Sequence, residues 1–221
     1  MTKPPISPAP GLGHYPTLTI VAFLRPPVYC LGVRLGLLLL LTIVTATTAQ
    51  QPQINLRDVN GVQHRQTDWT NKRAIVIFFT TVDCPLSNGY VPEMNRIQTE
   101  YAARGVAFYA VEADVSAKDP DVRQHAKEFG FTYPVLIDKR QSLVRLTGAT
   151  GTPEVAVLSG NGKVLYLGRI DNRVEDFDKR RNVVTEHDLK DALEAVLGGR
   201  PVARPRTQVV GCAITLEKNK P

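Results

Sequence analysis

The stretch "RAIVIFFTTVDCPLSNGYVPE" (residues 73–93) runs from an apolar segment into a single cysteine that is followed at once by proline. Its first nine residues are rich in β-branched and aromatic types without clear alternation, which predicts a strand buried on both faces of a sheet. Proline is tolerated in the first turn of a helix, so Pro85 favours a helix over residues 85–103. The cysteine, Cys84, therefore stands where a buried strand passes into a helix N-terminus.

The rest of the chain alternates strand-like and helical patterns and then changes. In chain order the predicted elements are an N-terminal hairpin turned at Asn60-Gly61, a strand at 105–114, a helix at 119–130, a strand at 133–138, a short helix at 141–148, a hairpin around Asn161-Gly162 at 152–171, a charged loop at 171–184 and a helix at 185–199. Parallel strands joined by helices, followed by an antiparallel hairpin, predict an α/β sandwich with a mixed central sheet and helices on both faces.

The first fifty residues differ from the rest in composition, because they contain no Asp or Glu. Leu35–Ala46 is an apolar run that follows a basic residue and precedes small residues at Thr47 and Ala49. This pattern predicts a signal peptide at residues 1–49. The uncharged segment is short for a membrane span of about 20 residues, and a retained N-terminal anchor is the alternative. Both interpretations predict an exported protein, periplasmic or extracellular.

The remainder is predicted to be one domain at residues 50–199 and an extended tail at 200–221. Three of the 27 Lys and Arg residues and none of the 21 Asp and Glu residues lie in the first fifty, so the remainder carries a net charge of +3. This small charge argues against a nucleic-acid partner. Contact with a membrane is expected only through the N-terminal segment, if that segment is retained.

Two interpretations of Cys84 follow from its position. Backbone N–H groups and the helix dipole stabilise a thiolate, which favours a nucleophile, although the neighbouring carboxylate of Asp83 opposes ionisation. The alternative is a small buried cysteine, which is common in protein cores. Ser87 stands where a Cys-x-x-Cys motif would have its second cysteine, so no disulfide can close within the motif.

Cys84 between strand and helix, Pro92 within the same helix, and Thr152-Pro153 at the start of a late hairpin together resemble the thioredoxin fold. The resemblance covers roughly residues 53–198. It implies that Pro153 follows a cis peptide bond and packs against the active cysteine. Thr152, Pro153 and Cys84 would then form one site. Pro85 and Ser87 would line the same site.

The segment "INLRDVNGVQH" (54–64) is similar to the redoxin branch of that fold, the alkyl hydroperoxide reductase/thiol-specific antioxidant relatives. Peroxiredoxins carry a threonine three residues before the reactive cysteine, and Thr81 occupies that position. They also carry a proline four residues before that threonine, where this chain has Ile77. The resemblance implies a thiol-based oxidoreductase, acting by thiol–disulfide exchange or peroxide reduction. It implies no cofactor, and it implies an external thiol reductant or a disulfide-bearing protein as partner.

The other cysteine outside the predicted signal peptide, Cys212, lies on the tail. At about 3.3 Å per residue, the tail beyond Gly198 could span on the order of 45 Å and fold back to Cys84. We expect Cys212 to resolve a sulfenic acid or mixed disulfide at Cys84, with Gly211 easing the backbone approach. The alternatives are a static disulfide that pins the tail and an unpaired cysteine on a solvated tail.

Three acidic residues are weaker candidates. Glu154 is predicted to be either a proton-transfer group near Cys84 or a hairpin residue facing solvent. Glu112 and Asp114 end a predicted strand at the same sheet edge as Cys84, where ligands of open α/β sheets bind. Arg169 is expected to pair with one of these two carboxylates.

The histidines show no spacing with a cysteine that would suggest a metal site, and we interpret them as surface residues. Those outside the predicted signal peptide are His64, His125 and His187. No metal site is therefore predicted. The alternative to an enzyme is a non-catalytic thioredoxin-like module that binds a partner protein or a copper ion.

Overall fold

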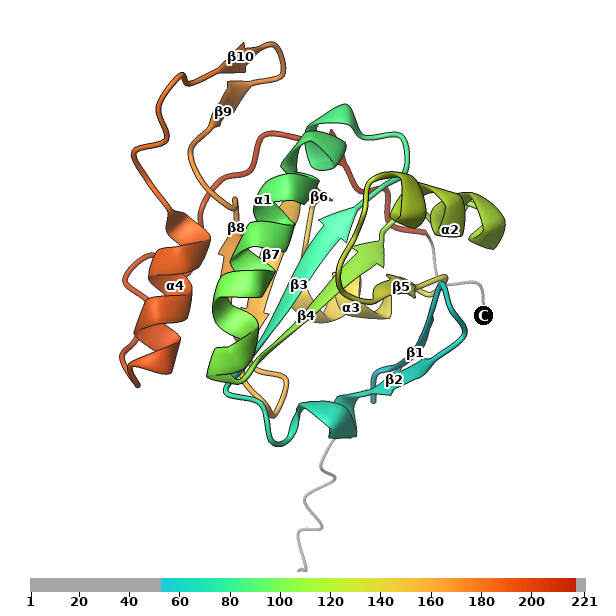
Figure 1. The fold of residues 1–221 in the computed structure, drawn as a ribbon, viewed down its shortest axis with the longest axis horizontal. Helices are drawn as coiled ribbons and strands as arrows, with labels where there is room; N and C mark the ends of the chain where they lie inside the picture. The colour runs from blue at the N-terminus through green and yellow to red at the C-terminus, as the bar shows by residue number, and fades with distance from the viewer. Residues whose placement is uncertain (1–52, 218–221) are drawn as a thin grey trace, which may run out of the picture. The chain divides into compact units, whose positions relative to one another are not determined.

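A seven-stranded sheet forms the centre of the computed structural model, which describes residues 53–217 (Figure 1). The strands lie in the order β2-β1-β5-β4-β3-β7-β8. Their bounds are β1 Asn55–Asp58, β2 Gln63–Arg65, β3 Ala74–Thr80, β4 Val106–Glu112, β5 Val135–Ile137, β7 Glu154–Leu158 and β8 Val164–Gly168. The predicted signal peptide, residues 1–49, lies outside the described residues.

The sheet is mixed, as predicted. Strands β3, β4 and β5 pair in parallel, whereas β1 joins β5 and β7 joins β3 in antiparallel fashion. All seven residues of β3 are buried, which agrees with its unbroken apolar pattern. The hairpins at Asn60-Gly61 and Asn161-Gly162 are both present, with each glycine at positive φ.

Helices cover both faces of the sheet, which confirms the predicted sandwich. Their bounds are η1 Gln66–Trp69, α1 Pro85–Tyr101, η2 Ala102–Arg104, α2 Asp119–Glu128, α3 Ser142–Thr147 and α4 Asp188–Leu197. On one face α1, α2 and α4 pack through residues such as Met94, Val122 and Leu193. On the other face α3 packs through Leu143, beside Trp69 of η1. Burial of each such side chain contributes about 1.5–3 kcal/mol to stability.

Two short antiparallel pairs lie outside the main sheet. Their strands are β6 Gly151–Thr152 with β11 Cys212–Ala213, and β9 Val174–Asp176 with β10 Lys179–Arg180. The prediction of a loop at 171–184 is therefore wrong, because the segment contains the β9–β10 hairpin. Charged residues conceal the hairpin in the sequence, although they stabilise it across the turn: Glu175 pairs with Lys179 at 2.6 Å and with Arg181 at 2.8 Å.

Beyond α4 the chain returns across the sheet edge (dark red in Figure 1). The Thr207 N–H donates to the Leu167 carbonyl of β8 at 3.2 Å, and the Ile214 N–H donates to the Thr150 carbonyl at 2.9 Å. We call residues 205–217 the strap. It occupies part of the open edge of β8 and then runs to β6, where it carries the second cysteine.

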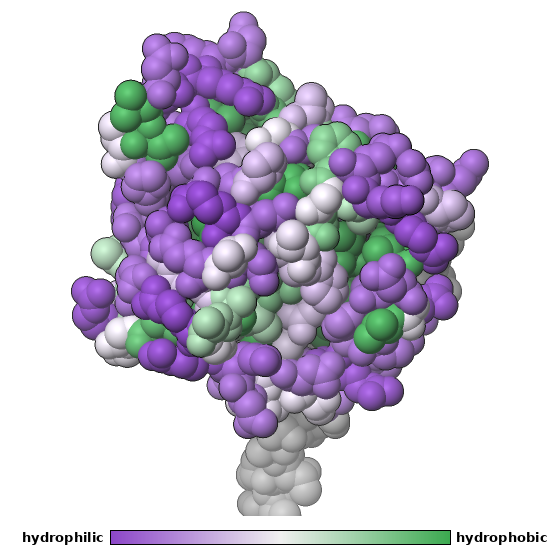
Figure 2. All heavy atoms as spheres, in the orientation of Figure 1, coloured by the Kyte–Doolittle hydropathy of each residue, from purple (hydrophilic) through white to green (hydrophobic). Residues whose placement is uncertain are grey.

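Polar residues cover most of the face shown in Figure 2, and hydrophobic residues are scattered across it. The large hydrophobic side chains that are exposed are Val62, Phe129, Phe177, Val183 and Leu216. Each helix within residues 53–217 is too short or too polar to cross a bilayer.

Candidate functional site

Cys84 is the N-cap residue of α1, and a short loop of residues 81–83 joins it to the end of β3. Its carbonyl accepts a hydrogen bond from Asn88 N at 2.9 Å, and its own N–H donates to the Thr81 carbonyl at 3.2 Å. Pro85 begins the helix, where its missing N–H costs nothing. The predicted strand–helix junction is present, and only 1 % of Cys84 is exposed.

Three segments meet at the Cys84 sulfur. The Ser87 N–H donates to Sγ at 3.4 Å, and the Cys84 thiol donates to the Thr152 carbonyl at 3.2 Å. The Sγ of Cys212 lies 2.7 Å from the Sγ of Cys84, and both residues are free cysteines. A helix N-terminus, the turn before β7 and the strap therefore converge on one sulfur atom.

The Thr152-Pro153 peptide bond is cis, as the resemblance implies, and both residues are buried. Thr152 belongs to β6, which pairs with β11 so that Cys212 lies opposite Thr152 and Ala213 lies opposite Gly151. This backbone pairing brings the strap cysteine to the site.

Gly211 is required for that pairing. A Cβ atom built on Gly211 would lie 2.1 Å from the Thr152 carbonyl oxygen, whereas real Cβ atoms essentially never come within 3.0 Å of another heavy atom. The strap therefore approaches β6 as closely as it does because residue 211 has no side chain, in agreement with the expectation from the sequence.

The two thiols differ in acidity. Burial raises the pKa of Cys84, but the hydrogen bonds from the Cys212 thiol and from the Ser87 N–H outweigh burial, so the pKa lies below its usual value. Burial raises the pKa of Cys212 to about 11, and the hydrogen bond and charge of Cys84 add to this effect. Cys84 is thus the thiol of the pair that ionises first.

Ser87 and Glu154 occupy the site in different ways. The Ser87 hydroxyl is fully buried and has no hydrogen-bond partner within the described residues. Glu154 is 3 % exposed, so the solvent-facing interpretation is wrong. Its carboxylate accepts from the N–H groups of Thr150 at 2.6 Å and Gly151 at 3.2 Å, which fixes the turn that leads into β6.

The acidic pair at the end of β4 has a local role. Glu112 is buried, its Oε1 accepts from Asp114 N at 3.0 Å, and burial raises the pKa of Glu112 to about 7. The expectation that Arg169 pairs with one of these carboxylates is wrong. Arg169 instead forms ion pairs with Glu186 and Asp188, close to the start of α4.

The prediction that His125 lies on the surface is also wrong, because only 6 % of the residue is exposed. Its Nε2 lies 2.7 Å from Asn88 Oδ1, and the Asn88 amide donates to the Val82 carbonyl at 3.0 Å. His64 is partly buried and lies 3.0 Å from Asp58, whereas His187 is exposed. His125 therefore supports the loop before Cys84, because α2 places it against α1.

Sequence reasoning missed Gln141, which is buried immediately before α3 and has a positive φ of 52°. Its amide nitrogen donates to the carbonyls of Ala113 and Thr215, and its amide oxygen accepts from Glu217 N. Nothing in the local sequence separates this glutamine from one on a solvated surface, because its partners are distant in the chain.

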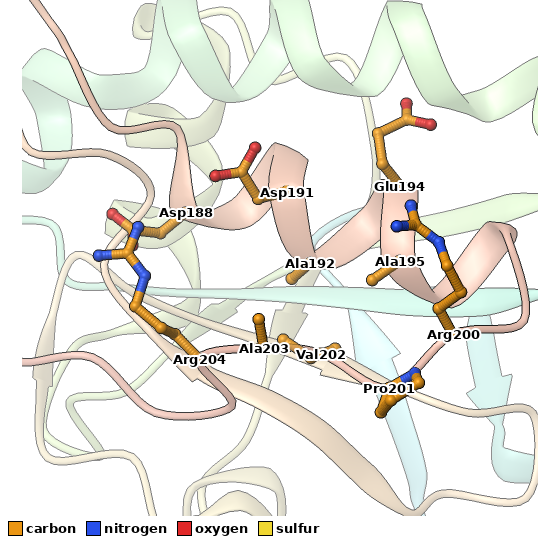
Figure 3. A pocket seen from close by; sticks show the side chains of 10 residues that line it. All are labelled: Asp188, Asp191, Ala192, Glu194, Ala195, Arg200, Pro201, Val202, Ala203 and Arg204. Carbon is orange, nitrogen blue, oxygen red and sulfur yellow. The ribbon is translucent and has the colours of Figure 1, made fainter.

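The structure contains a cavity away from the candidate site and a smaller one beside it. A cavity of about 430 Å³ lies between α4 and residues 200–204, which join α4 to the strap (Figure 3). Asp188, Arg200 and Arg204 are among the residues that line it, and none of the candidate site residues does. A smaller cavity of about 220 Å³ lies between Thr81 and the strap at Thr215. Within residues 53–217 no three His, Cys, Asp or Glu side chains gather as a metal site would require.

Comparison with known proteins shows which family and fold this chain resembles. The Redoxin family model matches residues 46–185. The thiol-disulfide oxidoreductase ResA of Geobacillus thermodenitrificans is 27 % identical over 151 residues, which cover 68 % of this chain and 78 % of the relative.

Solved structures match over a similar extent. An uncharacterized conserved protein from Geobacillus kaustophilus is 28 % identical, with a TM-score of 0.64 over 77 % of this chain and 92 % of that protein. A putative thiol:disulfide interchange protein DsbE from Chlorobium tepidum is 24 % identical, with a TM-score of 0.52 over 67 % and 95 % of the two chains. These matches confirm the thioredoxin-like sandwich.

Proposed function

The chain belongs to the redoxin family, and from that membership we propose that it is an exported thiol–disulfide oxidoreductase in which Cys84 attacks and Cys212 resolves. The contact between the two sulfurs carries this proposal. The ResA relative is a thiol-disulfide oxidoreductase by name, which supports the reaction class. We propose the same division of the chain as the sequence predicts: signal peptide 1–49, domain 50–199 and tail 200–221.

The difference in acidity assigns the order of attack. Cys84 has the lowered pKa, so its thiolate is the first nucleophile. It attacks one sulfur of a disulfide in a partner protein, a bond forms between Cys84 and that sulfur, and the other partner sulfur leaves as a thiolate. Cys84 and the partner are then joined by a mixed disulfide.

Cys212 completes the exchange. Its thiol gives up a proton and attacks the Cys84 sulfur, which forms the Cys84–Cys212 disulfide and releases the second partner sulfur as a thiol. Two electrons have then passed from the two cysteines to the partner disulfide. An external thiol reductant returns both cysteines to the reduced state, and no cofactor takes part.

Ser87 and the Thr152-Pro153 backbone support the attacking sulfur. The Ser87 N–H already contacts Sγ, and the buried Ser87 hydroxyl is available to the thiolate. Thr81 and Pro85 fix the loop and the helix start around it. We favour disulfide exchange over peroxide reduction because the peroxiredoxin motif is incomplete. Ile77, a fully buried residue of β3, stands where peroxiredoxins carry a proline.

Turnover and disulfide mapping test the proposal. The exported protein is incubated with a protein disulfide and a dithiol reductant, and the cysteine pairs are mapped by mass spectrometry before and after oxidant. We expect turnover that is lost in Cys84→Ser and a Cys84–Cys212 disulfide that the dithiol removes.

Two results would overturn the proposal. Turnover that survives Cys84→Ser would show that this thiol is not the nucleophile. A Cys84–Cys212 bond that resists the dithiol would make the pair a static link. In either case the non-catalytic module would become the better interpretation, and a copper titration followed by thiolate absorption would test its metal-binding form.

A further inference from the structure

The inference below rests on the proposed disulfide exchange. In the structure, access of a partner disulfide to Cys84 is sterically blocked. Only 1 % of Cys84 is exposed, and Cys212 lies against its sulfur. A partner disulfide must bring one of its sulfurs to the Cys84 sulfur before the first bond can form. The strap must therefore leave β6 during part of the reaction and return for the resolving step.

The strap is held firmly at its first end. The Thr207 hydroxyl lies 2.7 Å from the Tyr166 hydroxyl and accepts from Arg169 N at 3.0 Å. A Cβ atom on Gly168 would lie 2.1 Å from that Thr207 hydroxyl, so the contact needs glycine at residue 168. These contacts join the strap to β8 at a point before Cys212.

Gln141 holds the strap at its other end. Its Nε2 donates to the Thr215 carbonyl at 2.8 Å and to the Ala113 carbonyl at 3.1 Å, and its Oε1 accepts from Glu217 N at 2.9 Å. The side chain thus links the end of β4 to the strap. The left-handed backbone of Gln141 is unfavourable for a residue with a Cβ, and the residue is 1 % exposed. Such a conformation persists only where the surrounding contacts compensate for it.

Between these two ends the strap is held more weakly. Strand β11 contributes the pairs of Cys212 with Thr152 and of Ala213 with Gly151, and the Ile214 N–H next to it donates to the Thr150 carbonyl. Ala213 is exposed, and Cys212 is partly exposed. The segment that carries the resolving cysteine can therefore separate from β6 once the contacts at Gln141 are broken, while the Thr207 contacts keep it tethered nearby.

We propose that Gln141 is a positioning residue for Cys212, and that release of the strap from Gln141 opens Cys84 and the edge of β6 to an extended segment of a disulfide-bearing partner protein. The strap shows the chemistry that this edge accepts: an extended backbone with a cysteine opposite Thr152. The partner segment and the strap occupy the edge in turn. The seated strap gives a high local concentration of Cys212 for resolution, and the released strap admits the partner.

Alkylation of Cys84 tests the release step without requiring turnover. In full-length protein carrying Cys212→Ser, the alkylation of Cys84 by iodoacetamide is followed by mass spectrometry, with and without Gln141→Met. Methionine keeps the length of the side chain and removes its amide. We expect Gln141→Met to accelerate alkylation at least about tenfold, which corresponds to a loss of the seated population. Gln124→Met is the matched control, because Gln124 is exposed and its side-chain amide donates to Glu128 on the same helix.

The resolving step provides a second measurement. With Cys212 present, Gln141→Met is expected to slow closure of the Cys84–Cys212 disulfide from a preformed mixed disulfide at Cys84. Gly211→Ala provides an independent variant, because its new Cβ would clash with the Thr152 backbone where the strap pairs with β6 and would not alter Gln141. It is expected to accelerate alkylation and slow closure in the same way. A variant that only loosened the fold would lower the melting temperature without this pair of opposite changes.

The two proposals fail in different ways. If neither Gln141→Met nor Gly211→Ala changes the alkylation rate of Cys84, the strap does not control access, and the positioning role of Gln141 is overturned even where turnover is normal. If both variants open the site but the unaltered protein shows no turnover that depends on Cys84, the positioning role stands and the proposed oxidoreductase function falls.

Discussion

The sulfurs of Cys84 and Cys212 lie 2.7 Å apart, although 128 positions separate the two residues in the chain. The first caps the helix that follows the most buried strand, and the second is carried on the strap. The sequence motif at Cys84 has serine where a second cysteine would stand, and the fold supplies a second thiol from elsewhere. The pairing of the two thiols therefore depends on the tertiary structure and not on a local sequence motif.

Ser87→Cys should divert the disulfide. The Ser87 N–H lies 3.4 Å from the Cys84 sulfur, and the short loop between the two positions costs little closure entropy. We expect the introduced thiol to pair with Cys84 in a large share of the oxidised molecules, at the expense of the Cys84–Cys212 bond. Peptide mapping after oxidation measures the two shares. Ser87→Ala is the control, and an unchanged map in Ser87→Cys would contradict the geometry.

Cys84→Ser should make Cys212 more acidic. Burial raises the pKa of Cys212, the hydrogen bond and charge of Cys84 raise it further, and the charge of Cys84 is removed when serine replaces it. The pKa of Cys212 is therefore expected to fall from about 11 towards its usual value near 9. Thiolate absorbance recorded against pH provides the measurement. An unchanged upper titration step would show that the two thiols do not interact in solution.

Local sequence patterns predicted the fold well because each central element has a strong local signal. Strand β3 is uninterrupted apolar sequence, α1 begins at a proline, and the Asn60-Gly61 and Asn161-Gly162 turns mark two hairpins. The β9–β10 hairpin has no such signal. Its strands are short and charged, and its cross-strand ion pairs become visible only when the chain is folded.

The candidate site was predictable in part for the same reason. Cys84 stands out at a strand–helix junction, and Thr152-Pro153 stands out by resemblance. The positions of Glu154, His125 and Gln141 depend on segments that are distant in the chain, so their burial could not be inferred from neighbouring residues. The sequence alone does not distinguish a buried glutamate that accepts from backbone N–H groups, such as Glu154, from a glutamate that faces solvent.

Glu112→Gln should stabilise the protein at high pH. Burial raises the pKa of Glu112 in the folded state from about 4.5 to about 7. Between these values the unfolded chain releases the proton and the folded chain keeps it, so the stability of the unaltered protein falls as pH rises through this window. Glutamine keeps the oxygen that accepts from Asp114 N and cannot ionise. The expected gain at pH 8 is about 3 kcal/mol at most.

Urea unfolding at pH 4 and pH 8 measures this effect. The unaltered protein and Glu112→Gln should be similar in stability at pH 4, where both side chains are neutral, and should diverge at pH 8. Asp121→Asn is a suitable control, since its side chain is exposed at the start of α2. A constant difference at both pH values would mean that Glu112 ionises normally in the folded protein.

Glu154→Gln should separate positioning from proton transfer. The Glu154 carboxylate accepts from the N–H groups of Thr150 and Gly151, and these contacts place β6 opposite Cys212. Glutamine keeps one accepting oxygen but loses the charge, so we expect a loss of about 1 kcal/mol in the free energy of unfolding. Alkylation of Cys84 should keep the same dependence on pH, because no described contact joins Glu154 to the Cys84 sulfur. A shift in that pH profile would contradict this expectation and would assign Glu154 a part in moving the thiol proton.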